Sequence, residues 1–118
     1  MWGTGKPRRE FLYVDDLADA CRFLLESLNA DKLYDEMNIS HINIGCGKDL
    51  SIKELAITIA NIVGFKGDIR YDSSKPDGTP RKLLDISRLK TLGWAPNLSL
   101  NEGLRLSYKW YINHEYSA

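Results

Sequence analysis

The sequence has 118 residues, of which 43% are hydrophobic, 27% charged and 10% aromatic, a composition typical of one folded domain. Sixteen basic and sixteen acidic side chains cancel, so no net field favours nucleic acid or a membrane surface. No apolar run approaches the roughly 20 residues that cross a bilayer, and residues 1–10 lack the apolar stretch of a signal peptide. We therefore expect neither an integral membrane protein nor a disulfide-rich secreted module.

The first third of the chain predicts a strand, a helix and a loop. Residues 11–14 are β-prone, and an apolar stripe of period 3.6 predicts a helix over residues 16–28. Asp15 is placed to accept from the first amides of this helix, and Asp16 favours its positive end. Residues 29–40 are polar and aperiodic, which predicts a surface loop.

The middle of the chain predicts two strands around a helix. Residues 41–44 and 68–72 are short strand candidates. Between them, Ser51 and Glu54 have the S-x-x-E spacing of a capping box, and Gly64 provides a stop signal for the helix that follows.

The last third predicts a loop and two helices. Residues 73–82 hold two prolines and a glycine, which excludes a regular element. A short helix is expected over residues 85–92, and the capping-box spacing of Ser99 and Glu102 predicts a final helix through about Asn113. The order of elements indicates an α/β fold with few short strands and about four helices. So few strands make a poor parallel sheet, which is typical of part of a larger fold.

A basic segment (residues 1–10) is the first candidate site. Gly3 and Gly5 let backbone approach a ligand closely, and Arg9 offers paired donors that match a phosphate. Trp2 offers a flat apolar face for a base or sugar ring. The alternative is a solvated N-terminus with a few basic residues, because G-x-G alone is a weak signal.

A proline loop (residues 73–82) is the second candidate site. Its prolines stiffen the backbone, and an anionic ligand could meet Lys75, Arg81 or Lys82, which the spacing does not separate. Asp77 could accept from hydroxyls or from a base N–H. The alternative is a rigid surface turn whose charges face water.

Signals for catalysis and cofactor binding are not found in the sequence. There is no G-x-G-x-x-G between a strand and a helix, no Walker motif, no H-E-x-x-H and no nucleophile elbow. Tyr71 and Lys75 have Tyr-x-x-x-Lys spacing, but Pro76 excludes the helix that would align them. Cys21 and Cys46 have no Cys or His at metal-ligand spacing, so we expect free thiols in a reducing cytoplasm.

Four stretches resemble one enzyme family. Residues 2–18 are similar to the G-x-G-x-x-x-R-x-F-x-x-V-x-D stretch of extended short-chain dehydrogenases/reductases that act on nucleotide sugars. Residues 41–45 resemble the N-x-G strand end of that family, and residues 92–104 resemble its C-terminal signature. Residues 74–85 are similar to members whose substrates carry GDP.

The resemblance implies a GDP-sugar site. Trp2 and Arg9 match positions that contact the GDP-sugar, with Arg9 directed toward the diphosphate. Asp77 matches a substrate-contacting position, and Lys75 stands where relatives have a diphosphate-binding Arg.

The resemblance also implies what this chain lacks. In the family, the Gly-rich NADP loop, the catalytic Ser and Tyr-x-x-x-Lys, and the Cys and His of epimerisation all precede the matched region. Residues 1–118 would then be a C-terminal, nucleotide-sugar-binding segment without the NADP-binding domain, and Cys46 and His41 are not substitutes. NADP(H) serves the whole enzymes, which epimerise and reduce a keto sugar. We expect this chain alone to bind no cofactor or metal and to have no turnover.

Two expectations concern partners. The apolar stripe over residues 17–28 would lack part of its cover, so we expect a homo-oligomer or association with a cofactor-binding domain. Alternative functions are a non-catalytic binding or regulatory module, a remnant that pairs with a full-length relative, or a segment of another nucleotide-sugar epimerase/dehydratase.

Overall fold

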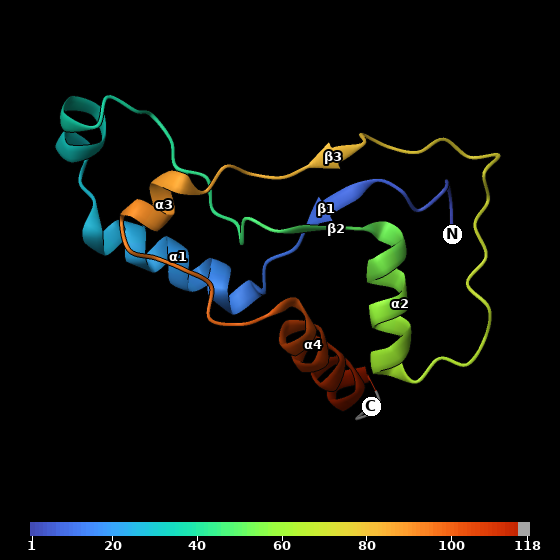
Figure 1. Cartoon of the computed structure of the whole chain (residues 1–118). Coiled ribbons are helices and arrows are strands. Elements are labelled where there is room, and N and C mark those ends of the chain that lie inside the picture. The colour runs from blue at the N-terminus through green and yellow to red at the C-terminus, as the bar shows by residue number, and fades with distance from the viewer. Residues whose placement is uncertain (116–118) are drawn as a thin grey trace.

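The computed structural model describes residues 1–115, which form five helices and three short strands (Figure 1). Strand β1 (Arg8–Glu10) is central in the sheet, antiparallel to β2 (Asp49–Ser51) and parallel to β3 (Arg81–Lys82). The helices are α1 (Val14–Ser27), the π-helix η1 (Lys32–Glu36), α2 (Ile52–Val63), α3 (Ser87–Thr91) and α4 (Leu100–Glu115). The predicted class, α/β with few short strands, is confirmed.

The helices that carry local sequence signals lie where the sequence predicts them. The capping box of α2 is formed, with the Ser51 side chain accepting from the Glu54 amide at 3.1 Å and the Glu54 side chain accepting from the Ser51 amide at 2.7 Å. Gly64 ends α2 with a φ of 72°. The same reciprocal bonds join Ser99 and Glu102 at the start of α4.

The start of α1 differs from the prediction. Its N-cap is Tyr13, which makes no side-chain capping bond, so the role predicted for Asp15 is wrong. Asp16 instead is 3% exposed and accepts from the amides of Asn97 and Leu98, both at 3.1 Å. A buried carboxylate needs such donors, and here they come from a turn 81 and 82 residues away.

The predicted strands are wrong in position. Residues 11–14 do not form a strand, because the paired backbone is that of β1, just before them. Residues 41–44 are also not a strand: Ile42 and Ile44 pack against the core, and Asn43 donates to the Asp85 carbonyl. Residues 68–72 contribute one isolated bridge, between Asp72 and Trp2.

Two predicted loops contain short regular elements. Residues 29–40 hold the π-helix η1, where the Met37 amide donates to the Lys32 carbonyl. The proline loop ends in β3, whose Arg81 and Lys82 pair with β1. A strand of two residues is too short to show a pattern of alternating side chains, so pairing with the neighbouring strand determines whether these residues are extended.

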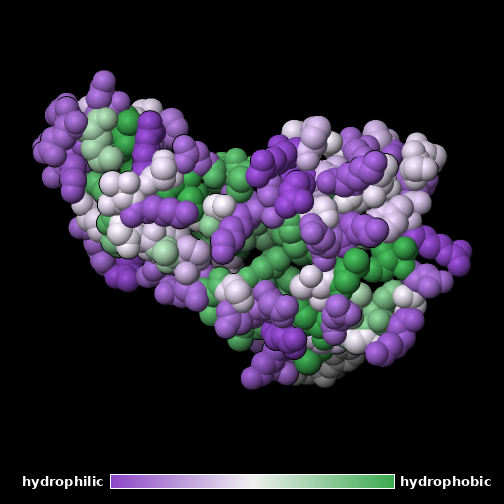
Figure 2. All heavy atoms as spheres, viewed as in Figure 1, coloured by the Kyte–Doolittle hydropathy of each residue, from purple (hydrophilic) through white to green (hydrophobic). Residues whose placement is uncertain are grey.

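The core within residues 1–115 is small. Its buried apolar members are Ala20 on α1, Leu89 on α3, and Ile86 and Trp94 beside them. The radius of gyration is 17.9 Å, against about 13.5 Å for a compact chain of this length. Apolar atoms lie open on the surface between the η1 end and the α2 end of the molecule (Figure 2). Much of the apolar surface is therefore not covered by this chain.

Candidate functional site

The basic segment and the proline loop lie side by side, although they are about 70 residues apart in sequence. The Gly3 amide donates to the Asp72 carbonyl at 2.9 Å, and Trp2 forms a parallel bridge with Asp72. Further along, the Thr4 amide and hydroxyl donate to the two carboxylate oxygens of Asp77, at 2.8 and 2.6 Å. In Figure 1 the two segments run together near the N-terminus. The two predicted candidate sites are thus one surface.

Glycine is required where the segments meet. Gly3 has a φ of +75°, a conformation that residues with a side chain rarely adopt. A Cβ at this position would lie 2.2 Å from Oδ1 of Asp77. Gly3 therefore serves close packing of the chain against its own proline loop.

Trp2 and Lys75 form the outer part of this surface. The Trp2 side chain is 79% exposed, and Lys75 Nζ lies 5.8 Å from the centroid of its ring. That distance is within the range of a cation–π contact. An exposed indole beside an ammonium can stack on a planar ring and attract a phosphate on the same ligand.

Arg9 and Lys82 share one face of the sheet. They are paired positions of the parallel strands β1 and β3, and paired side chains lie on the same face. Arg9 Nη1 donates to the Arg8 carbonyl at 2.6 Å, and its guanidinium lies close to Gly78 of the proline loop. Spacing alone did not identify Lys82, because the signal appears only once its strand register with Arg9 is known.

Arg8 and Arg81 form the preceding pair of the register and share an acceptor on β2. The Asp49 side chain is 5% exposed and accepts from Arg8 Nε at 3.0 Å and from Arg81 Nε. The hydrogen bonds from Arg81 and Arg8 hold the pKa of the Asp49 carboxyl below its ordinary value, against the effect of burial. Arg81 is therefore committed to an internal ion pair. Among the described residues, the ammonium groups of Lys75 and Lys82 in the proline loop form no ion pair with an acid.

Asp77 lies at the centre of the contact between the two segments. The Thr4 hydroxyl and amide hold the pKa of its carboxyl below the ordinary value, so the carboxylate is charged at neutral pH. Both oxygens already accept from Thr4, although each keeps further acceptor capacity. Sequence reasoning missed Thr4, because a threonine between two glycines carries no signal without its partner.

The described residues do not fit an NADP molecule. The connection from β1 to α1 is Phe11-Leu12-Tyr13, with no glycine to let a pyrophosphate approach. The N-termini of the three long helices carry acidic side chains: Asp15 and Asp16 on α1, Glu54 on α2 and Glu102 on α4. Negative side chains in the first turn disfavour a phosphate at these helix N-termini, where it would meet the helix amides.

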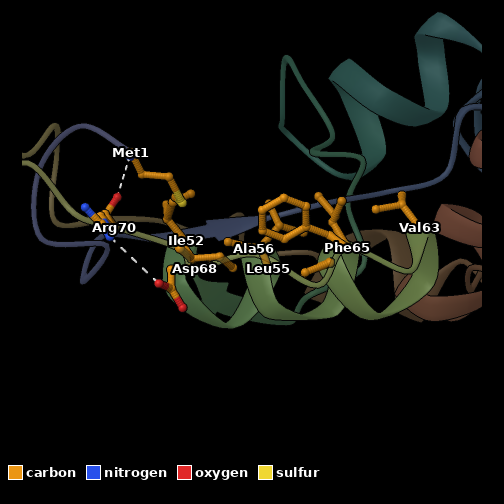
Figure 3. Close-up of a pocket in the computed structure, with 11 residues that line it drawn as sticks. Met1, Ile52, Leu55, Ala56, Val63, Phe65, Asp68 and Arg70 are labelled. Carbon is orange, nitrogen blue, oxygen red and sulfur yellow. Dashed lines mark hydrogen bonds and ion pairs between the residues drawn. The ribbon is translucent and has the colours of Figure 1, made fainter.

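Two other features of residues 1–115 do not suit a nucleotide or a metal ion. An apolar groove of about 500 Å³ runs along α2 between Met1 and Phe65 (Figure 3), and its lining does not suit a charged nucleotide. In this part of the chain no group of three or more His, Cys, Asp or Glu could hold a metal ion. Cys21 and Cys46 are free thiols, as predicted. No helix among the described residues is long and apolar enough to span a membrane.

Sequence comparison identifies relatives. A family profile described as NAD dependent epimerase/dehydratase matches residues 1–45. GDP-L-fucose synthase 1 of Arabidopsis thaliana is 50% identical over 114 residues, covering 97% of this chain and 33% of the relative. GDP-L-fucose synthase of Escherichia coli K12 is 49% identical, covering 98% of this chain and 36% of the relative. The chain thus spans about a third of the length of these relatives.

Comparison with solved structures finds the same partial similarity. A GDP-6-OMe-4-keto-L-xylo-heptose reductase from Campylobacter jejuni is 42% identical with a TM-score of 0.88, covering 96% of this chain and 33% of that one. A GDP-mannoheptose C4 reductase from the same organism, with NADP bound, is also 42% identical, with a TM-score of 0.80 over 94% of this chain and 33% of that one. The chain is therefore a relative of GDP-L-fucose synthase that belongs to the extended short-chain dehydrogenase/reductase family and matches about one third of that enzyme's length.

Proposed function

We propose that this chain is the C-terminal, GDP-sugar-binding segment of an enzyme of the GDP-L-fucose synthase type, and that it binds its ligand without catalysing a reaction alone. The observation that carries the proposal is the meeting of the basic segment with the proline loop. That meeting places Lys75 against Trp2 and Asp77 against Thr4, and brings Arg9, the register partner of Lys82, close to Gly78 of the same loop. An aromatic face with three nearby cations suits a nucleoside diphosphate better than any neutral ligand.

Each side chain has a role in this proposal. The Arg9 guanidinium binds the diphosphate through paired donors, and Lys82 beside it adds a second charge. Trp2 stacks on the base or the sugar, while Lys75 neutralises phosphate at the outer end. Anchoring of the nucleotide holds the sugar steady, which is how remote binding energy serves a reaction at another centre.

We assign hydride and proton transfer to groups outside this chain. In relatives of this type, GDP-4-keto-6-deoxy-D-mannose is epimerised at C3 and C5 and then reduced at C4 by NADPH. The described residues fit neither that cofactor nor a Ser/Tyr/Lys catalytic set. Isolated chain mixed with NADPH and keto sugar is expected to show no turnover.

The exposed surface supports a partner that covers α1. The accessible area is 8532 Å², whereas a compact monomer of 13.4 kDa exposes about 6,500 Å². The excess is comparable to one side of an obligate interface. On α1, Val14, Leu17 and Leu25 are 65%, 43% and 83% exposed. We propose that a cofactor-binding domain packs there, and that a second copy of the chain takes its place when that domain is absent. Free thiols at Cys21 and Cys46 suit a reducing compartment such as the cytoplasm.

Calorimetric titration with GDP and with UDP tests the binding proposal. Wild-type chain is expected to bind GDP more tightly than UDP, and Arg9→Ala to lose at least tenfold in affinity, because a charge-assisted bidentate contact is lost. Arg105→Ala on α4, which removes the same charge from an exposed helix, is the matched control. Absence of GDP binding by the wild type would refute the proposal and would favour the alternative that the chain is a remnant. Equal binding of UDP would indicate another nucleotide-sugar epimerase/dehydratase.

A further inference from the structure

The Asp77 carboxylate is directed at its own chain. Its two oxygens accept from the amide and the hydroxyl of Thr4, 73 residues earlier, at 2.8 and 2.6 Å. The Thr4 hydroxyl oxygen in turn accepts from the Lys6 amide at 3.3 Å. A threonine is thus held between a loop carboxylate and the backbone that leads toward Arg9.

Backbone packing shows that this contact is tight. Gly3 takes a left-handed φ, and a Cβ there would overlap Oδ1 of Asp77. The Gly3 amide is bound to the Asp72 carbonyl at 2.9 Å, and the Lys75 amide donates to the same carbonyl at 3.2 Å. The backbone on each side of the contact is therefore fixed as well.

We propose that Asp77 is a positioning residue rather than a residue that contacts the nucleotide, and that with Thr4 it forms a latch that holds Trp2 and Lys75 together before the ligand arrives. This inference rests on the proposed GDP-binding function. Trp2 is two residues from Thr4 and Lys75 two residues from Asp77, so the latch sets the distance between indole and ammonium. The 5.8 Å spacing of that pair is the geometry the latch maintains.

The latch raises the affinity for GDP by raising the fraction of molecules in which Trp2 and Lys75 face the same ligand, which is the binding-competent fraction. When the two segments separate, Trp2 and Lys75 no longer face one ligand, and the observed affinity falls in proportion to the competent fraction. Both partners are exposed, so the loss is expected to be about three- to tenfold and not complete. This loss of affinity does not depend on which base the nucleotide carries.

Two substitutions at position 77 separate the latch from direct contact. In Asp77→Asn, the amide oxygen can still accept from the Thr4 amide and the NH₂ group can donate to the Thr4 hydroxyl oxygen. We expect Asp77→Asn to bind GDP within about twofold of the wild type and Asp77→Ala to lose about three- to tenfold. If the carboxylate accepted from guanine, Asn would instead be as damaging as Ala, because its NH₂ group would face the donors of the base. That result would overturn the inference.

Thr4 supplies the second half of the test. Thr4→Val removes the hydroxyl and Thr4→Ser keeps it, so we expect Thr4→Val to weaken GDP binding and Thr4→Ser to restore it. The double variant Thr4→Val/Asp77→Ala is expected to be no weaker than Asp77→Ala, since both changes open the same contact. Additive losses would show that Asp77 acts independently of Thr4.

Hydrogen exchange tests the latch in the absence of ligand. Failure of the latch can therefore be distinguished from failure of the proposed binding function. In the apo chain, the peptide containing the Thr4 amide is expected to exchange faster in Asp77→Ala than in the wild type, and at the wild-type rate in Asp77→Asn. Unchanged exchange in Asp77→Ala refutes the latch. Faster exchange in a chain that does not bind GDP would leave the latch standing and refute the binding function instead.

Discussion

Substitution of Asp16 by alanine tests whether one buried carboxylate joins the two ends of the chain. Asp16 is 3% exposed and accepts from the Asn97 amide at 3.1 Å, the Asn97 side chain at 3.3 Å and the Leu98 amide at 3.1 Å. Alanine leaves two backbone N–H groups without this acceptor at a part-buried position, where loss of the partner costs toward the lower half of the roughly 1–3 kcal/mol range for a buried donor. We expect the free energy of unfolding to fall by about 3 kcal/mol, which lowers the melting temperature by about 12 °C at this chain length.

Thermal and urea unfolding, followed by circular dichroism, measure this effect. Asp15→Ala is the matched control, because Asp15 is exposed in the same first turn of α1 and its replacement is expected to cost no more than about 0.5 kcal/mol. Asp16→Asn keeps one acceptor oxygen and is expected to fall between the two. Equal destabilisation by Asp15→Ala and Asp16→Ala would show that Asp16 acts through the helix dipole alone, and would refute the role of the turn at residues 97–98.

Three further predictions concern the frame of the site and its surroundings. Ser51→Ala opens the capping box of α2 and is expected to reduce the free energy of unfolding in urea by about 1 kcal/mol, whereas Ser107→Ala at an interior helix position is the control. The pKa of the Asp49 carboxyl is lowered chiefly by Arg81, so its contribution to stability is present above the ordinary Asp pKa of about 3.9 and is lost as the pH falls through the lower folded value. The melting temperature of Arg81→Gln should therefore fall less than that of the wild type when the pH is lowered from about 5 to about 2.5, across the ordinary Asp pKa. Leu25→Glu places a charge on the most exposed leucine of α1 and is expected to raise the concentration at which the chain self-associates in sedimentation velocity runs, and an unchanged concentration would exclude α1 from the contact.

The helices could be predicted because their signals are local. Ser51 and Glu54 are three residues apart and bond to each other, so their spacing contains the whole interaction. The same holds for Ser99 and Glu102. Such pairs form whatever the rest of the chain does, and the boundaries of α2 and α4 follow from them.

The strands could not be predicted because their pairing is not local. β1 is stabilised by backbone partners 39 or more residues away and by Asp49, which accepts from Arg8 of β1 and Arg81 of β3. Residues 11–14 have the stronger β propensity, yet the backbone pairs at Arg8–Glu10. Propensity measures the fit of a side chain to a sheet, and in a strand of three residues the available partner decides the outcome.

The candidate site falls between these two cases. The types of residue that suit a diphosphate were visible in the sequence, and so was the proximity of Trp2 to Arg9 along the chain. The separate roles of Lys75, Arg81 and Lys82 were not visible. Those of Arg81 and Lys82 depend on the register of β3 with β1 and on the buried Asp49 that binds Arg81, and that of Lys75 depends on its contact with Trp2. Charge composition identifies candidate cations, but register selects among them.

The proposed nucleotide site and the helix α1 differ in how far this chain alone completes their contacts. The contacts that build the proposed GDP site, from Thr4 to Asp77 and from Arg9 to β3, all lie within residues 1–82. The helix α1, by contrast, leaves Leu17 and Leu25 open to solvent and has only Ala20 fully buried against the small core. Binding is therefore expected to survive in the isolated chain as far as the chain stays folded. A domain that covers α1 would raise the stability of the fold, and would bring the cofactor close to the proposed nucleotide site, whose internal contacts are already made within this chain.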